Sequence, residues 1–112
     1  MWRNVLVAIW IVEVEIMKMF LVVYNSFHDE HVTNAFKQAG YKFYTKTRGA
    51  TGEGAETLPK LHSHFFPGTN NLLFVAVPDE EISRIVDFAQ ILKAENPGTG
   101  LRGFIFPLEQ CV

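Results

Sequence analysis

The chain has 112 residues, of which 48% are hydrophobic and 20% are charged, and its formal net charge is -2 at pH 7. This length and apolar content predict one globular domain with a modest core, and we expect no second domain. The charge balance lacks the clustered Lys and Arg that phosphate neutralisation requires, so it argues against nucleic-acid binding. The single cysteine, Cys111, favours a reducing cytoplasm over a disulfide framework or a thiolate zinc site.

The first sixteen residues precede the pattern of the domain. They are strongly apolar, but Glu13 and Glu15 interrupt the run before the roughly 18 residues that a membrane span needs, and no small-residue cleavage site follows. We therefore expect no direct membrane insertion. Residues 11–16 alternate as a strand with one polar face would. Equally, translation could begin at Met17 or Met19, which would make the preceding residues, 1–16, a dispensable N-terminal extension of a domain over 17–112.

A strand followed by a helix is expected next. Residues 18–25 are a continuous apolar run of strand length, typical of a central strand. Ser26 is the expected N-cap of the helix, and Asp29 and Glu30 lie in its first turn, where carboxylates suit the helix dipole. Gly40 is the expected helix end. The apolar spacing predicts one buried face, made of Val32, Ala35, Phe36 and Ala39.

The second half of the domain repeats this pattern. Residues 41–46 alternate aromatic and polar as a second strand with one covered face should, and residues 72–77 are an apolar third strand. A helix starts at Pro78–Glu81 and is broken at Asn96–Gly100, and residues 103–108 give a fourth strand. The inner face of this helix is predicted to be Ile82, Ile85, Val86, Ala89 and Leu92.

The order strand, helix, strand, strand, helix, strand predicts an α+β fold. It is the ferredoxin-like βαββαβ sandwich, in which both helices cover one face of a four-stranded antiparallel sheet. The other face would still carry Phe, Val, Leu and Ile, and a chain this short cannot cover it alone. We therefore expect an oligomer that buries this apolar patch.

The long loop between strands 2 and 3, Thr45–Asn71, is the segment most suited to function. It holds four of the eight glycines, two prolines and two of the four histidines. Connections this long in a compact domain are usually functional or disordered. Binding groups concentrate on loops carried by a rigid scaffold, so this loop is where we expect the site.

Three stretches resemble the PII signalling proteins and their PII-like relatives. Residues 45–54 (TKTRGATGEG) are similar to the glycine-bearing base of the family's large loop, and Leu58-Pro59-Lys60 is similar to a motif near the far end of that loop. Residues 98–109 (GTGLRGFIFPLE) resemble the phosphate-cradling turn and the last core strand. The loop has no tyrosine to be uridylylated, so the chain resembles a divergent PII-like protein.

This resemblance implies a cytoplasmic homotrimer of ferredoxin-like subunits. An adenine nucleotide (ATP, ADP or cyclic AMP) would bind as an effector in the cleft between neighbouring subunits. The long loop would then control a target protein, such as a membrane transporter or an enzyme, as a signal-transduction device.

Glycines are the physical basis for a phosphate site. Glycine permits positive φ and close backbone approach, so successive N–H groups can form an anion nest. A helix-terminating turn and a flexible loop would explain the same glycines. With the family resemblance included, this interpretation and the phosphate site are equally supported. The predicted ligand-binding residues are Gly49, Thr51, Gly52, Glu53, Lys60, Gly98, Thr99, Gly100 and Arg102.

Metal binding is the alternative function. On an extended segment His62 and His64 project to one face, and imidazoles are common transition-metal ligands. A CutA-like trimeric divalent-metal-binding protein is therefore the rival, although two histidines are too few for a structural zinc. A third alternative is an interaction module whose loop clasps a neighbouring subunit. No nucleophile elbow or orienting acid is present, so we expect no enzymatic activity.

Overall fold

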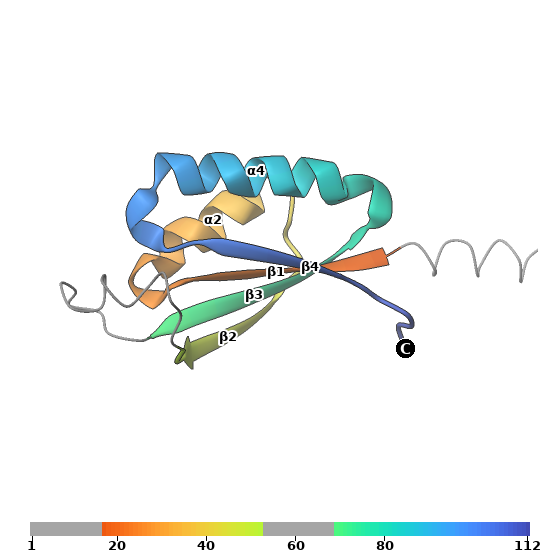
Figure 1. Cartoon of the computed structure of the whole chain (residues 1–112), viewed down its shortest axis with the longest axis horizontal. Helices are drawn as coiled ribbons and strands as arrows, with labels where there is room; N and C mark the ends of the chain where they lie inside the picture. Colours follow the sequence, from red (N-terminus) through yellow and green to blue (C-terminus); the bar gives the residue numbers. More distant parts are fainter. Residues whose placement is uncertain (1–16, 53–68) are drawn as a thin grey trace, which may run out of the picture.

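A computed structural model describes residues 17–52 and 69–112. The two α-helices lie on one face of the sheet, which confirms the predicted α+β ferredoxin-like arrangement (Figure 1). No helix in the described ranges is long and apolar enough to span a membrane. The elements are β1 (Met17–Asn25), the 3₁₀ turn η1 (Ser26–His28), α2 (Asp29–Gln38), β2 (Thr45–Ala50), β3 (Asn70–Pro78), the 3₁₀ turn η2 (Asp79–Glu81), α4 (Ile82–Glu95), the 3₁₀ turn η3 (Pro97–Thr99) and β4 (Arg102–Pro107).

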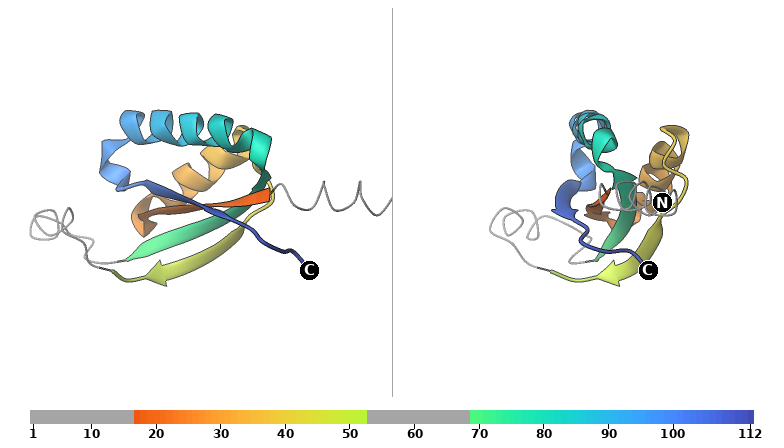
Figure 2. Two further views of the ribbon diagram at one scale, coloured as in Figure 1. Left: turned by 45° about the vertical axis from the view of Figure 1, so that its right-hand side comes forward. Right: turned by 90° about the vertical axis from the view of Figure 1, so that its right-hand side faces the viewer.

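The four antiparallel strands are ordered β2-β3-β1-β4, so β1 and β3 are central and β2 and β4 are the two edges. At the end of β1, Tyr24 lies opposite Asn71 of β3. On the other side of β1, Val23 lies opposite Arg102 of β4. The start of β3 and the start of β4 therefore lie at the same end of the sheet, as Figure 2 also shows.

The core lies between the sheet and the helices. Alternate residues of the central strands point toward the helices and are buried, and Phe36 of α2 meets Phe88 of α4 edge-on at 4.9 Å between ring centroids. The predicted inner faces of both helices are confirmed, and four of their positions are partly buried: Ala35, Ala39, Ile82 and Val86. The strands contribute Phe20, Val22, Tyr24, Leu73, Val75 and Val77, and the helices contribute Val32, Phe36, Ile85, Ala89 and Leu92.

The sheet face turned away from the helices is also apolar. Directly opposed residues of antiparallel strands share a face, and Leu21 lies opposite both Phe74 and Phe104. Phe104 and Phe106 of edge strand β4 are 50% and 39% exposed in a single copy. We call this surface the open face, and it consists of Met19, Leu21, Val23, Leu72, Phe74, Phe104 and Phe106.

Two predicted boundaries are wrong. The second strand was expected over 41–46 but begins at Thr45, because Tyr41 is anchored to the helices instead: its N–H donates to Phe36 O at 2.9 Å and its hydroxyl accepts from Arg84. Because β2 extends to Ala50 and β3 begins at Asn70, the connection between them is shorter than the predicted Thr45–Asn71.

The expected N-cap is also displaced. The side chain of Asn25, rather than Ser26, accepts from the Phe27 N–H, and a 3₁₀ turn precedes the first α-helix. Ser26 instead bonds Thr69 through its backbone N–H and its hydroxyl, at 3.2 and 2.9 Å. The residue predicted to cap the helix thus ties β1 to the segment that leads into β3.

Candidate functional site

The base of the long loop has a backbone geometry that requires glycine. We call it the loop root: residues 48–50 at the end of β2 and Asn70 and Asn71 at the start of β3. The β2–β3 register shifts between Thr47 and Ala50, and Gly49 within this irregularity has φ +70°. A side chain at position 49 would meet nothing within 4 Å, so conformation rather than space demands glycine there. The Gly49 N–H donates to Asn71 Oδ1 at 3.1 Å.

A single carboxylate organises the polar groups beside the loop root. Asp29, at the start of α2, accepts from the Tyr24 hydroxyl at 2.6 Å and from Lys46 Nζ at 3.0 Å. The Thr33 hydroxyl donates to it at 3.3 Å, and Arg48 Nη1 lies 3.7 Å from it. The Asp29 side chain is 20% exposed and that of Lys46 is 12% exposed. The pair is therefore largely withdrawn from water.

The protonation states of this cluster follow from its contacts. Burial alone would raise the pKa of Asp29, but hydrogen bonds from Tyr24 and Lys46 outweigh it and hold that pKa well below its usual range. Burial, with the bond to Asp29, raises the pKa of Tyr24 well above its usual value. At neutral pH the carboxylate is charged and the phenol is a permanent donor.

Among the described residues, two cations lie beside the one carboxylate of this cluster. Lys46 and Arg48 both approach Asp29, so two cations face one carboxylate. The two differ in role, because the Lys46 side chain is withdrawn into the pair whereas that of Arg48 is 72% exposed. The Gly49 N–H is already donated to Asn71 Oδ1, so the exposed guanidinium of Arg48 is the group here that suits an anionic ligand.

The second glycine turn lies between α4 and β4. Gly100 has φ +63°. Thr99 is 1% exposed, and its hydroxyl donates to Asn96 O at 2.9 Å and accepts the Leu101 N–H at 3.3 Å. The hydroxyl of Thr99, one of the predicted ligand residues, therefore makes hydrogen bonds within its own turn. Gly98 lies near the imidazole of His28.

The structure places the two glycine turns at one end of the sheet but on opposite edges. Gly49 is on β2 and Arg102 begins β4, with β3 and β1 between them. Three strand spacings separate the two edges, or about 14 Å. The predicted residues Gly98, Thr99, Gly100 and Arg102 are therefore brought together, as are Gly49, Thr51 and Gly52 by adjacency in the chain, but a single copy does not join the two groups. Glu53, Lys60, His62 and His64 lie outside the described residues.

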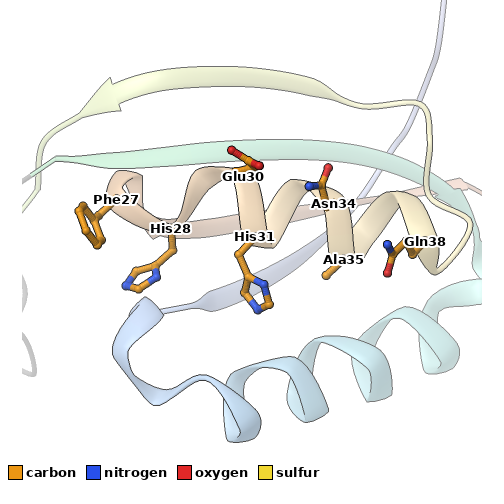
Figure 3. A pocket seen from close by; sticks show the side chains of 7 residues that line it. All are labelled: Phe27, His28, Glu30, His31, Asn34, Ala35 and Gln38. Carbon is orange, nitrogen blue, oxygen red and sulfur yellow. The ribbon is translucent and has the colours of Figure 1, made fainter.

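A groove of about 540 Å³ runs along α2 on the side where α4 lies. His28 and His31 point into it, with Glu30 and Asn34 nearby (Figure 3). Phe27 and His28 both line the groove, and their rings are in T-shaped contact. Within residues 17–52 and 69–112, no group of three or more His, Cys, Asp or Glu could hold a metal ion.

Four residues of the loop-root cluster were not predicted as site residues: Tyr24, Asp29, Lys46 and Asn71. Asp29 was interpreted as a first-turn carboxylate that suits the helix dipole, an interpretation that ignores its neighbours. The available signal was Thr33 one turn later, since a polar i, i+4 pair can mark a helix face turned toward other polar groups. Asn71 gave a weaker signal, as a polar residue directly before an apolar strand.

Comparisons with known proteins agree with this fold. The model of the family Nitrogen regulatory protein P-II matches residues 17–112. No curated protein matches the chain. A solved structure of CPII from Thiomonas intermedia K12, bound to ADP, AMP and acetate, is 19% identical with a TM-score of 0.62, over 86% of this chain and 89% of that one.

Two further structures are similar. A PII-like signalling protein from Thermus thermophilus is 24% identical with a TM-score of 0.56, over 82% of this chain and 85% of that one. PII from Arabidopsis thaliana, bound to citrate, is 11% identical with a TM-score of 0.59, over 85% and 79%. At these identities the structures show the fold alone, whereas the family match extends over the whole described domain. The chain therefore belongs to the PII family of nitrogen regulatory signalling proteins, as a divergent PII-like member.

Proposed function

We propose that this chain is a regulator that binds a small anionic effector, an adenine nucleotide, in clefts between copies of itself. The observation that carries this proposal is the pair of positive-φ glycine turns at one end of the sheet, around Gly49 and Gly100, with Arg48 and Arg102 beside them. Glycine lets the backbone of such a turn approach a phosphate closely, and the arginines supply positive charge.

The cleft would form between copies because the two turns lie on opposite edge strands. A neighbouring copy that brings its β4 edge toward β2 would bring Gly100 and Arg102 toward Gly49. A site built this way needs both copies, so effector binding and assembly are coupled. The structure of CPII bound to ADP and AMP supports adenine nucleotides as the first ligands to test.

Assembly itself is supported by the open face. Seven apolar side chains on one side of a sheet, in a chain of 112 residues, leave a surface that a second copy would cover. We propose a homotrimer. Light scattering should report three copies per particle for the native chain, and Phe104→Asp should shift the particle toward a single copy by placing a charge on the open face. A native particle of one copy at working concentration would end the proposal of shared clefts.

Isothermal titration calorimetry tests the effector. ATP, ADP and cyclic AMP are titrated into the native chain, into Arg48→Gln and into Lys42→Gln. Arg48 is exposed at the loop root, whereas Lys42 is an exposed lysine that precedes β2 and lies at the other end of that strand. We expect at least one nucleotide to bind, roughly tenfold more weakly to Arg48→Gln because a charged contact is lost, and unchanged to Lys42→Gln. No heat with any nucleotide would remove this effector class.

Control of a target protein by the chain between β2 and β3 is the remaining part of the proposal. The target would be a transporter or an enzyme in the cytoplasm, and the effector would shift the population of loop conformations that dock on it. Affinity capture with and without nucleotide tests this directly, since only nucleotide-dependent capture fits the mechanism. Metal binding by His62 and His64 stays a prediction. Copper or zinc titration of the native chain and of the double alanine variant decides it.

A further inference from the structure

The Asp29 carboxylate accepts hydrogen bonds from three elements near the loop root. Tyr24 donates from β1, Thr33 from its own helix, and Lys46 from β2. Asn71 of β3 lies beside this cluster, because it is buried and lies directly opposite Tyr24 in the register of β1 and β3. One largely withdrawn charge thus connects α2 to β1 and β2, at the end where β2 and β3 join the long loop.

Asn71 connects this cluster to Gly49 in the loop root. It is 2% exposed, and its side-chain oxygen accepts the N–H of Gly49, the positive-φ residue of the β2 irregularity. The Tyr24 side chain, which lies opposite Asn71, donates to Asp29, and Lys46, three residues before Gly49, donates to it as well. Through these two side chains the setting of Asn71 and Gly49 depends on the acceptor at position 29.

We propose that Asp29 is a positioning residue for the loop root: it holds Lys46 and also Tyr24, the cross-strand partner of Asn71, and so fixes Gly49 in its left-handed conformation without touching any ligand. Its consequence for effector affinity rests on the proposed function, but its effect on Gly49 does not. Asp29→Asn removes the charge and places an amide, which donates as well as accepts, where the cluster needs an acceptor.

A second carboxylate provides a matched control. Asp79 pairs with Lys18 of β1 at the opposite end of the sheet from the loop root. Asp79→Asn therefore makes the same chemical change to a strand lysine's partner and leaves Gly49 undisturbed. The readout is amide hydrogen exchange of Gly49 in the ligand-free protein, followed by NMR, with the Val22 amide on β1 as the reference for global opening.

We expect Gly49 exchange to rise about tenfold or more in Asp29→Asn relative to Val22, and to be unchanged in Asp79→Asn. Equal acceleration of Gly49 and Val22 would mean that Asp29 only stabilises the fold, and would overturn the positioning role. So would unchanged Gly49 exchange. If Asp29→Asn does not fold, Lys46→Gln, which keeps a polar group but removes the charge, should raise Gly49 exchange in the same direction.

Nucleotide affinity is then measured separately on the same variants. If the native chain binds ATP, Asp29→Asn should weaken binding and Asp79→Asn should not. Equal ATP affinity of Asp29→Asn and the native chain would overturn the link between position 29 and the effector site. If the native chain binds no nucleotide, the proposed effector fails, while the Gly49 measurement still decides whether Asp29 positions the loop root.

Discussion

The two ends of the sheet carry the same kind of ion pair in different surroundings. At the loop root, Lys46 and Asp29 have side chains that are 12% and 20% exposed, and the carboxylate has further donors. At the opposite end, the side chains of Lys18 and Asp79 are 35% and 44% exposed. Both pairs join a strand lysine to an aspartate at the start of a helical segment.

The difference shows which pair the structure depends on. An exposed pair gains little because water screens it and solvates either partner alone. A withdrawn carboxylate loses its hydration and needs every donor around it, so removing it leaves buried donors without a partner. The Asp29–Lys46 pair should therefore contribute more to stability than the Asp79–Lys18 pair.

The largest contrast is expected for Asp29→Asn against Asp79→Asn. Asp29→Asn should lower the free energy of unfolding by roughly 2–3 kcal/mol at pH 7, because charge-assisted hydrogen bonds from Tyr24 and Lys46 are lost. Urea denaturation at one fixed protein concentration measures it. Equal losses in the two variants would contradict the inference that the Asp29 pair contributes more to stability than the Asp79 pair.

The free energy of unfolding should depend on pH through Asp29. The pKa of Asp29 in the folded chain lies well below its usual value, so its stabilisation is complete above the unfolded pKa of about 3.9. That stabilisation is lost as the pH falls below this value toward the folded pKa, because protons then bind the unfolded chain more readily. The native chain should lose stability between about pH 5 and pH 2.

Asp29→Asn tests whether Asp29 causes this loss of stability at low pH. Its unfolding free energy should fall less over the same pH range, since it has no carboxylate at position 29 to protonate. Denaturation curves at several pH values for both proteins give the comparison. Parallel profiles would place the acid sensitivity in other carboxylates.

A smaller effect is expected for Tyr24→Phe, which removes only the hydroxyl that donates to Asp29 at 2.6 Å. The ring stays in the core, so we expect a loss of about 1 kcal/mol. The pKa of Tyr24 is raised in the folded chain, so its linked stabilisation is present below about pH 10 and is lost as the pH rises further. Tyr24→Phe should remove that alkaline component, which denaturation above about pH 10 would show.

The sheet and both helix faces could be predicted from the sequence because each depends on a local period. The i, i+3, i+4 spacing placed Val32 and Phe36 in the core, and the apolar runs gave the central strands. The second strand was misplaced because Tyr41 packs on Phe36 and accepts a hydrogen bond from Arg84, a residue distant in the chain. An alternating pattern cannot distinguish such an anchor from a strand residue.

The candidate site was predictable only in part. Gly49 and Gly100 were identified from glycine chemistry, and both adopt positive φ. Asp29 was not, because its role comes from Tyr24 and Lys46 meeting through the β1–β3 and β2–β3 registers, which no local pattern contains. Thr99 shows the converse, since a polar residue between two glycines resembles a ligand group but bonds within its own turn.

The smallest effect is expected at the opposite end of the sheet. Asp79→Asn should change the free energy of unfolding by about 0.5 kcal/mol or less, because both side chains of the Lys18 pair are partly in water and each can be solvated alone. The measurement is urea denaturation in low salt and in about 0.5 M salt, where screening should reduce even this small difference. A loss as large as that of Asp29→Asn would show that exposure does not separate the two pairs, and that the position of a carboxylate at the start of a helical segment decides its worth instead.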